Sequence, residues 1–339
     1  MKKFVFAVVG ALGNVGEEVL NILEGIDLPI KDLILMDIGQ NIGKKIIWRN
    51  KEYTVVDSKP DSFSGVDIAI MSAGSEASKE LSPRAVELGC IVIDNSTAYR
   101  MSPEHPLVIP EVNAHELLNH NGIIANPNCS TIQMLVVLCP IHKKYNITRV
   151  IVSTYQAVSG SGFVGTDELK RQIKNVSAGE KTFSSVFPHQ IVLNIIPHID
   201  SFLENGYSKE EMKMILETGK ILDPKIKITA TTVRVPVITG HSESINIQTK
   251  KNFKMNEIIT LLANSPGIEI EDNPEKNVYP TPLSSSGKNS VFVGRIRRDF
   301  SETNAINIWC VSDNLRKGAA LNTVQIAQEL INRNLVRVR

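Results

Sequence analysis

One cysteine of this 339-residue chain stands where covalent chemistry is possible. The run Asn126-Pro-Asn-Cys129-Ser-Thr sets a polar turn before the cysteine, and an apolar pattern at helical spacing continues to Leu138. Cys129 is therefore expected at or near a helix N-terminus, where partial positive charge favours the thiolate. The remaining cysteines suit small core positions instead: Cys90, Cys139 and Cys310.

A glycine-rich turn near the N-terminus is a second candidate site. The run Gly10-Ala-Leu-Gly13-Asn-Val-Gly16 lies between an apolar run at residues 4–9 and a helical pattern that ends at Gly25. Glycines let the backbone approach a pyrophosphate closely, and amides at a helix start face its negative charge. The spacing is GxxGxxG rather than the strict GxGxxG, so the spacing alone is weak evidence. The interpretation as a dinucleotide site rests on the position of the turn directly after a buried strand.

Asp37 bears on which dinucleotide binds there. It closes the second apolar run, about 20 residues beyond the last glycine, where a carboxylate commonly accepts the ribose 2′-hydroxyl of NAD. Lys44 and Lys45 could instead hold the 2′-phosphate of NADP, and Asp37 could be an ordinary turn residue at a strand end. The residues alone leave the cofactor open.

A thiolate beside a nicotinamide ring implies aldehyde oxidation through a thioester. The thiol adds to the aldehyde, hydride leaves to the cofactor, and the acyl group stays on sulfur. A base must take up and return a proton. His241 is the candidate, because it follows a strand and a glycine-containing turn in the run Arg234-Val-Pro-Val-Ile-Thr-Gly-His241. On the residues alone, His189 and His198 rank only slightly lower.

Two patterns of strands and helices must position these residues. The first part alternates short apolar runs with helical stretches such as 76–89, which predicts an α/β, doubly wound (Rossmann-type) parallel sheet; the runs are 33–36, 66–71, 91–93 and 123–125. The second part predicts an α+β domain with a mixed or antiparallel sheet and helices on one face; its strands are 147–158, 226–238, 241–249 and 304–312. A closing helix at 318–334 is expected to return to the first domain. The predicted domains are 1–129 with 315–339, and 130–314.

Composition argues against several other classes of protein. The net charge is +1 with no basic tail, so a nucleic-acid partner has no electrostatic support. No apolar run approaches the roughly 20 residues of a membrane helix, and the N-terminal apolar run leads into the glycines without a cleavage site. The cysteines form no CxxC pair, so neither a disulfide framework nor a zinc site is expected. A cytoplasmic enzyme without a metal fits best.

Longer motifs along nearly the whole chain resemble aspartate-β-semialdehyde dehydrogenase. They occur in the family's order and include Ser72-Ala-Gly-Ser, Asp94-Asn-Ser-Thr-Ala-Tyr-Arg100-Met, Val108-Ile-Pro-Glu-Val-Asn113, Asn128-Cys-Ser-Thr131, Thr154-Tyr-Gln156-Ala-Val-Ser-Gly160, Arg234-Val-Pro, His241-Ser and Asp313-Asn-Leu-Arg-Lys-Gly-Ala. The resemblance implies reversible, phosphate-dependent interconversion of L-aspartyl 4-phosphate and L-aspartate 4-semialdehyde, in lysine (diaminopimelate), threonine and methionine biosynthesis. It also implies a homodimer.

The resemblance further implies a role for each site residue. Cys129 is the nucleophile, His241 the acid/base and Gln156 the group that orients the acyl carbon. Arg234 binds the substrate carboxylate, and Glu210, with Glu211 as its rival, binds the substrate amine. Phosphate binding is implied for Arg100, Asn128 and Lys213. Contacts to the dinucleotide are implied for Gly10, Leu12, Gly13, Asn14, Val15, Asp37, Gln40, Asn41, Ser72, Gly74, Ser159, Gly160 and Asn314.

One departure from the family pattern concerns the cofactor. Many relatives carry Arg-Ser just after the second strand, where the arginine meets a 2′-phosphate, but this chain has Gln40-Asn41. NADP remains the expectation from the resemblance, with NAD as the alternative. Two other functions are weighed: N-acetyl-glutamyl-phosphate reductase, which would not need a carboxylate for a free amine, and a non-catalytic dinucleotide-sensing protein.

Overall fold

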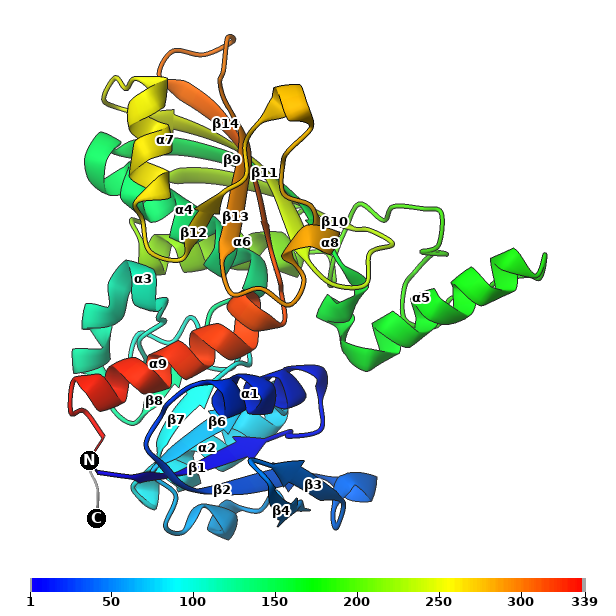
Figure 1. The fold of residues 1–339 in the computed structure, drawn as a ribbon, viewed down its shortest axis with the longest axis vertical. Coiled ribbons are helices and arrows are strands. Elements are labelled where there is room, and N and C mark those ends of the chain that lie inside the picture. Colours follow the sequence, from blue (N-terminus) through cyan, green and yellow to red (C-terminus); the bar gives the residue numbers. More distant parts are fainter. Residues whose placement is uncertain (1, 337–339) are drawn as a thin grey trace. The chain divides into compact units, whose positions relative to one another are not determined.

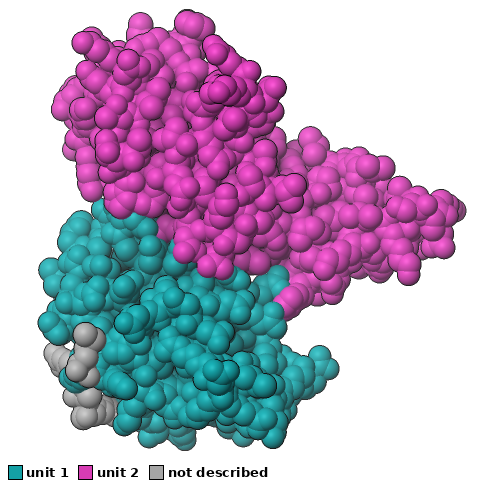
Figure 2. Space-filling model, in the orientation of Figure 1, with its two compact units in different colours: residues 1–128, 319–339 teal, residues 129–318 magenta. Residues whose placement is uncertain are grey.

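The chain forms two compact units in a computed structural model that describes residues 2–336. The first unit comprises Met1–Asn128 and Ala319–Arg339, and the second comprises Cys129–Gly318 (Figure 2). Cys129 therefore begins the second unit, whereas the sequence analysis assigned it to the end of the first domain.

The first unit is built on a six-stranded parallel sheet, as predicted (Figure 1). The strand order is β5-β2-β1-β6-β7-β8, and each neighbouring pair is parallel. The strands are β1 (Phe4–Val9), β2 (Ile30–Asp37), β5 (Val56–Asp57), β6 (Ile68–Met71), β7 (Ile91–Asp94) and β8 (Ile123–Ala125).

Helices cover both faces of this first sheet, which explains why its strands are continuous apolar runs. Phe6 and Val8 of β1 pack in a core with α1 (Asn14–Gly25) and α9 (Leu321–Asn332). Ala7 and Val9 face the opposite core, which includes α2 (Ser75–Glu87). Because α9 packs in the first unit, the prediction that the closing helix returns there is confirmed.

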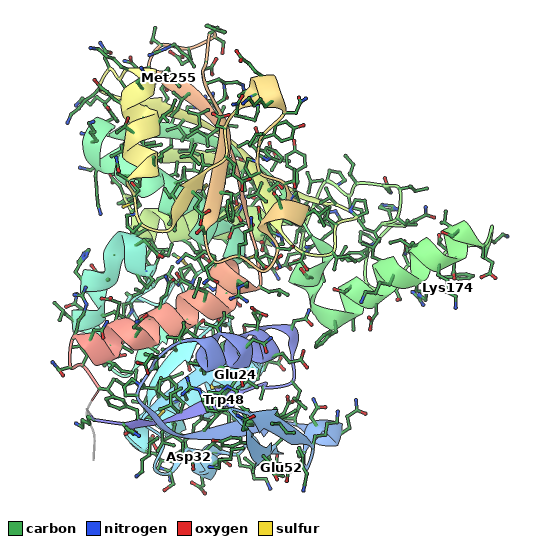
Figure 3. All side chains as sticks on the ribbon, viewed as in Figure 1. Glu24, Asp32, Trp48, Glu52, Lys174 and Met255 are labelled. Carbon is green, nitrogen blue, oxygen red and sulfur yellow. The ribbon has the colours of Figure 1, made fainter. Side chains whose placement is uncertain are left out.

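A small hairpin in the first unit was not predicted. Its strands are β3 (Lys45–Trp48) and β4 (Lys51–Thr54). Trp48 points toward α1 (Figure 3), and its indole Nε1 donates a hydrogen bond to the Leu20 carbonyl at 3.1 Å. The hairpin therefore joins the core through Trp48, and Ile46 and Tyr53 pack against the same core. The short run of alternating residues gave little sign of it. The same unit contains the short helix α3 (Pro110–Asn113).

The second unit contains a six-stranded mixed sheet, as predicted. The strand order is β10-β9-β11-β14-β13-β12, with parallel outer pairs and antiparallel inner pairs. The strands are β9 (Ile147–Gln156), β10 (Lys227–Arg234), β11 (His241–Thr249), β12 (Ile268–Ile270), β13 (Val291–Arg298) and β14 (Ala305–Ser312). Of these, β12 and β13 were not predicted.

Three helices lie on one face of this second sheet (Figure 1). The central one is α4 (Cys129–Tyr145), which contacts β9, β11 and β14 and is flanked by α6 (Lys209–Ile221) and α7 (Met255–Ala263). The short helix α8 (Pro282–Ser285) contacts β14.

A further helix, α5 (Gly162–Ser177), extends away from the second sheet, with Lys174 on its outer part (Figures 1 and 3). Neither α5 nor α7 was predicted from the sequence. Within the described residues, no helix is long and apolar enough to cross a membrane.

Candidate active site

Cys129 is the first residue of α4 and is half-buried, which confirms the predicted position at a helix N-terminus. The chain returns to it at Gly318, where a Cβ atom would lie 2.8 Å from the Cβ of Cys129. Only glycine leaves room at that point. The other three cysteines are buried, as their sequence settings predicted.

His241 begins β11 and is fully buried. The Ala157 amide donates a hydrogen bond to its Nδ1 at 3.1 Å, so Nε2 is the ring nitrogen left for a ligand. Burial holds the pKa of His241 well below its ordinary value, and the positive charge of Arg234 acts in the same direction. The Gly240 carbonyl, which accepts from the protonated ring, opposes this only in part. The resting imidazole is therefore neutral at physiological pH.

Sheet register brings Arg234 and Gln156 to the same edge as His241. Arg234 is the last residue of β10 and pairs with Gln156, the last residue of β9, while β11 starts beside them with His241. The Arg234 guanidinium is held by one hydrogen bond, in which NH1 donates to the Ala157 carbonyl at 2.6 Å. Burial lowers the pKa of Arg234, and the charges of Glu210 and Cys129 act against that shift.

Gly160 keeps open the space between the guanidinium and the imidazole. A Cβ atom on Gly160 would lie 2.9 Å from NH1 of Arg234 and 3.4 Å from Nε2 of His241. Both functional groups therefore border a volume that any larger side chain would occupy. Glycine at this position therefore leaves the guanidinium and the imidazole bordering the same space.

A buried carboxylate from α6 completes this cluster. Glu210 Oε1 accepts a hydrogen bond from Gln156 Nε2 at 3.3 Å, and its Oε2 lies 3.1 Å from the ammonium of Lys213. Lys213 also pairs with Asp200 at 3.0 Å. Burial works against the charge of Lys213, but the two carboxylates outweigh it and raise its pKa above the ordinary value. Glu210 is thus paired with Lys213 and interacts electrostatically with the Arg234 guanidinium.

Glu211 faces elsewhere. Its carboxylate accepts hydrogen bonds from the backbone amides of Ser208 at 2.7 Å and Thr232 at 3.0 Å, and it forms the capping box that starts α6. The geometry therefore favours Glu210 over its rival for binding a substrate amine.

Asn314, which is implied for dinucleotide contact, is hydrogen-bonded to Ser159, another such residue, and to Gly240. Its Nδ2 donates to Ser159 Oγ at 3.0 Å, and its Oδ1 accepts from the Gly240 amide at 2.9 Å. Ser159 precedes Gly160, and Gly240 precedes His241. Asn314 thus joins the turn at Gly160 to the start of β11.

The glycine turn of the first unit fits a dinucleotide pyrophosphate. Gly10 has φ of +73°, and a Cβ atom there would lie 2.8 Å from the Ser72 carbonyl oxygen. A Cβ on Gly16 would collide with the Gly10 carbonyl oxygen. Because α1 begins at Asn14, its first backbone amides lack acceptors within the helix and can face an anion. Leu12 and Gly13 lie in this turn, and Asn14 and Val15 begin α1.

Asp37 lies beside this turn, at the end of β2. Its Oδ2 accepts a hydrogen bond from the Leu12 amide at 3.0 Å, and its Oδ1 accepts one from the Ile38 amide at 2.8 Å. Gln40 and Asn41 follow in a short 3₁₀ helix, where the Lys44 ammonium donates to Asn41 Oδ1 at 2.6 Å.

Two of the predicted phosphate ligands belong to the first unit. Arg100 is buried, and its NH2 donates to the Asn95 carbonyl at 2.9 Å. Asn95 in turn donates a hydrogen bond through Nδ2 to Ser72 Oγ at 3.2 Å. Gly74, with φ of +86°, directly precedes α2. Asn128 is buried directly before Cys129 in the chain. The third, Lys213, is in the second unit, so the joint phosphate site remains a prediction.

The structure adds contact residues that sequence patterns did not indicate. Ala157, Asp200 and Gly318 contact predicted site residues, yet none carries a motif signal beyond its neighbours. His189 is exposed, and His198 stacks on Phe202 with ring centroids 4.5 Å apart. Among the described residues, no cluster of His, Cys, Asp and Glu could hold a metal ion.

Comparisons with known proteins agree on the family. Residues 6–120 match the model of "Semialdehyde dehydrogenase, NAD binding domain", and residues 138–317 match "Semialdehyde dehydrogenase, dimerisation domain". The aspartate-semialdehyde dehydrogenases of Aquifex aeolicus and Bacillus subtilis are 49% and 48% identical to this chain, each over 97% of it and 98% of the relative. The chain belongs to the aspartate-semialdehyde dehydrogenase family.

Solved structures of the aspartate-semialdehyde dehydrogenase family agree with this fold. The crystal structure of aspartate semialdehyde dehydrogenase II from Vibrio cholerae, complexed with ASA, has a TM-score of 0.95 and 42% sequence identity. The match covers 98% of this chain and 99% of that one. The resemblance drawn from the motifs is therefore confirmed, as is the fold class, and the enzyme has a nicotinamide dinucleotide-binding domain.

Proposed function

We propose that the enzyme catalyses the phosphate-dependent interconversion of L-aspartyl 4-phosphate and L-aspartate 4-semialdehyde through a thioester on Cys129. The observation that carries the proposal is the cluster of Arg234, His241 and Glu210 at one edge of the second sheet. The reaction belongs to lysine, threonine and methionine biosynthesis. We further propose a cytoplasmic homodimer, in keeping with the match to a dimerisation domain.

The cluster suits a substrate that carries both a carboxylate and an amine. Arg234 offers a planar fork of N–H donors to the carboxylate, and its bond to the Ala157 carbonyl fixes the direction of that fork. The Glu210 carboxylate, paired with Lys213, offers a partner for the ammonium group. Arg100, Asn128 and Lys213 are proposed to bind the phosphate.

Each chemical step then has a protein group. In the biosynthetic direction the Cys129 thiolate forms a bond to the acyl carbon, the carbon–oxygen bond to phosphate breaks, and phosphate leaves with that electron pair. Gln156 holds the acyl group in position. When bound, the reduced dinucleotide supplies the hydride that reduces the thioester. His241 Nε2 gives a proton to the oxygen of the hemithioacetal on Cys129 and takes it back as the carbon–sulfur bond breaks, so the semialdehyde is released and Cys129 returns as the thiolate.

The dinucleotide is held by the glycine turn of the first unit in this proposal. Its backbone amides face the pyrophosphate, and Gly160, Ser159 and Asn314 are proposed contacts from the second unit. The resemblance implies NADP as the cofactor, whereas the residues around Asp37 favour NAD.

Two other functions are less well supported. An N-acetyl-glutamyl-phosphate reductase would not need the Glu210 carboxylate at this position, because its substrate amine is acylated. A non-catalytic dinucleotide sensor would not require a neutral imidazole and a buried guanidinium on either side of Gly160. A paired assay with aspartate semialdehyde and N-acetyl-glutamate semialdehyde separates the first alternative.

The direct test mixes purified enzyme with aspartate semialdehyde, inorganic phosphate and NADP or NAD, and follows absorbance of the reduced cofactor. We expect signal that depends on phosphate and disappears in Cys129→Ala. Absence of signal with both cofactors, or signal indifferent to phosphate, contradicts the proposal.

A further inference from the structure

The side chain at the end of β2 has spare capacity to accept hydrogen bonds. A carboxylate offers about four acceptor positions, and the Leu12 and Ile38 amides use two of those on Asp37. The bond to Leu12 also fixes the carboxylate beside the glycine turn. Two adjacent hydroxyl groups on a ribose would match the positions that remain.

A second carboxylate ends the neighbouring strand. In the parallel pairing of β2 with β5, Asp37 lies opposite Asp57. Asp57 is partly exposed and pairs with Lys59 at 3.0 Å. Two acidic residues therefore stand side by side at the edge of the first sheet, next to the turn that would hold the pyrophosphate. A phosphate on the ribose carries between about one and a half and two negative charges at neutral pH and would be repelled there.

The positively charged side chains that follow Asp37 in the chain interact with other groups. The segment 37–45 contains no arginine, the group that usually accommodates a 2′-phosphate. Lys45 pairs with Glu52 at 2.7 Å across the hairpin. Lys44 donates to Asn41 Oδ1, and Gln40 presents a neutral amide.

We propose that Asp37 makes this enzyme select NAD over NADP, by accepting hydrogen bonds from the ribose hydroxyls and, with Asp57, repelling a 2′-phosphate. This specificity rests on the proposed function, since it concerns the cofactor of that reaction. It departs from the cofactor that the family resemblance implies.

The first test is equilibrium binding without substrate. Purified enzyme is titrated calorimetrically with NADH and, separately, with NADPH at the same ionic strength. We expect NADH to bind at least about tenfold more tightly, the effect of one charged hydrogen-bonding partner. Equal or tighter binding of NADPH overturns the specificity, and the proposed function still stands if either cofactor supports turnover. Binding of neither dinucleotide overturns the proposed function itself.

The second test reverses the preference. Asp37→Ser keeps a hydroxyl near the Leu12 amide but removes the charge, and Gln40→Arg adds a guanidinium where the segment has none. We expect the double variant to favour NADPH by about tenfold. Lys44→Ala is the matched control, and it should change the NADH to NADPH affinity ratio by less than about threefold. Thermal unfolding checks that each variant is folded. A folded double variant that keeps the wild-type ratio contradicts a role for Asp37.

Discussion

The two units build their sites from different parts of the chain. In the first unit the glycine turn at residues 10–16 presents backbone amides, and its requirements are for small residues and tight turns. In the second unit the candidate site consists of side chains from β9, β10, β11 and α6, which sheet register and helix packing bring together. A backbone site depends on local sequence, whereas a side-chain site depends on contacts between distant segments.

The comparison predicts separable effects. Changes in the second unit should alter substrate kinetics and leave dinucleotide affinity intact, while changes in the glycine turn should do the reverse. A variant that disturbs both measurements equally would show that the two sites are not independent in function.

The largest effect is expected for Cys129→Ala. Removing the thiol removes the only route proposed for covalent catalysis, so turnover should fall by about four orders of magnitude or more. Dinucleotide affinity, measured by calorimetry, should stay within about twofold of wild type. Cys139→Ala, which removes a buried thiol from the same helix, should leave turnover nearly unchanged. Substantial activity in Cys129→Ala would rule out the thioester.

Arg234→Leu should have the next largest effect. Loss of a charged, two-point contact with the substrate carboxylate should lower kcat/KM for aspartate semialdehyde by about 10- to 100-fold, with most of the change in KM. Arg171→Leu, which removes an arginine paired with Glu168 on α5, is the control and should change kcat/KM little. Steady-state kinetics at saturating cofactor make the measurement. A normal KM in Arg234→Leu would remove this residue from substrate binding.

Gly16→Ala tests the first unit in the same way. Its Cβ would collide with the Gly10 carbonyl oxygen, so the turn must shift, and we expect dinucleotide affinity to fall by about tenfold and stability by about 1–3 kcal/mol. Gly25→Ala, at the other end of α1, meets no atom within 4 Å and should be neutral or slightly stabilising. Calorimetric titration and thermal unfolding of both variants provide the comparison. Unchanged affinity in Gly16→Ala would place the pyrophosphate elsewhere.

The same contrast explains what the sequence could predict. The strands of the first unit are apolar on both faces and the glycine turn is continuous in sequence, so both were predicted from local patterns. Helix α5 was not, because large apolar side chains on it, such as Phe163 and Val164, are exposed and blur its amphipathic pattern.

The second site could not be predicted from periodicity at all. Arg234 and Gln156 are neighbours only because β10 pairs with β9 in this register. The two segments are far apart in sequence: the hydrogen bond from Arg234 to Ala157 joins residues 77 positions apart. Their roles came from the family resemblance. Gly318 and Asp200 carry no chemical signal in sequence, and only their contacts identify them.

The last prediction concerns stability rather than activity, at a buried carboxyl group near the second site, Glu243, whose partner is a thiol, whereas that of Glu210 is an ammonium group. Glu243 is fully buried on β11, and the Cys310 thiol donates a hydrogen bond to its Oε2 at 3.4 Å. Burial raises its pKa well above the ordinary value of 4.5, and the Cys310 and Gln133 side chains oppose that only in part. The native group is therefore protonated at pH values where the unfolded chain has lost this proton.

The sign of the resulting pH dependence follows from that difference. Above about pH 4.5 the native state binds more protons than the unfolded state, so Glu243 makes stability fall as pH rises toward its native pKa, by about 1.4 kcal/mol per pH unit. Glu243→Gln has a similar shape but no ionisable proton, so its unfolding free energy should not show this fall. The difference in unfolding free energy, variant minus wild type, should therefore increase by about 1.4 kcal/mol per pH unit. Urea unfolding at pH 5, 6 and 7 measures the difference. For the exposed Glu257→Gln control, whose carboxylate has a lowered pKa, the difference from wild type should stay constant over this range. A constant difference for Glu243→Gln as well would mean that Glu243 is ionised in the native protein, and the contrast with Glu210 would fail.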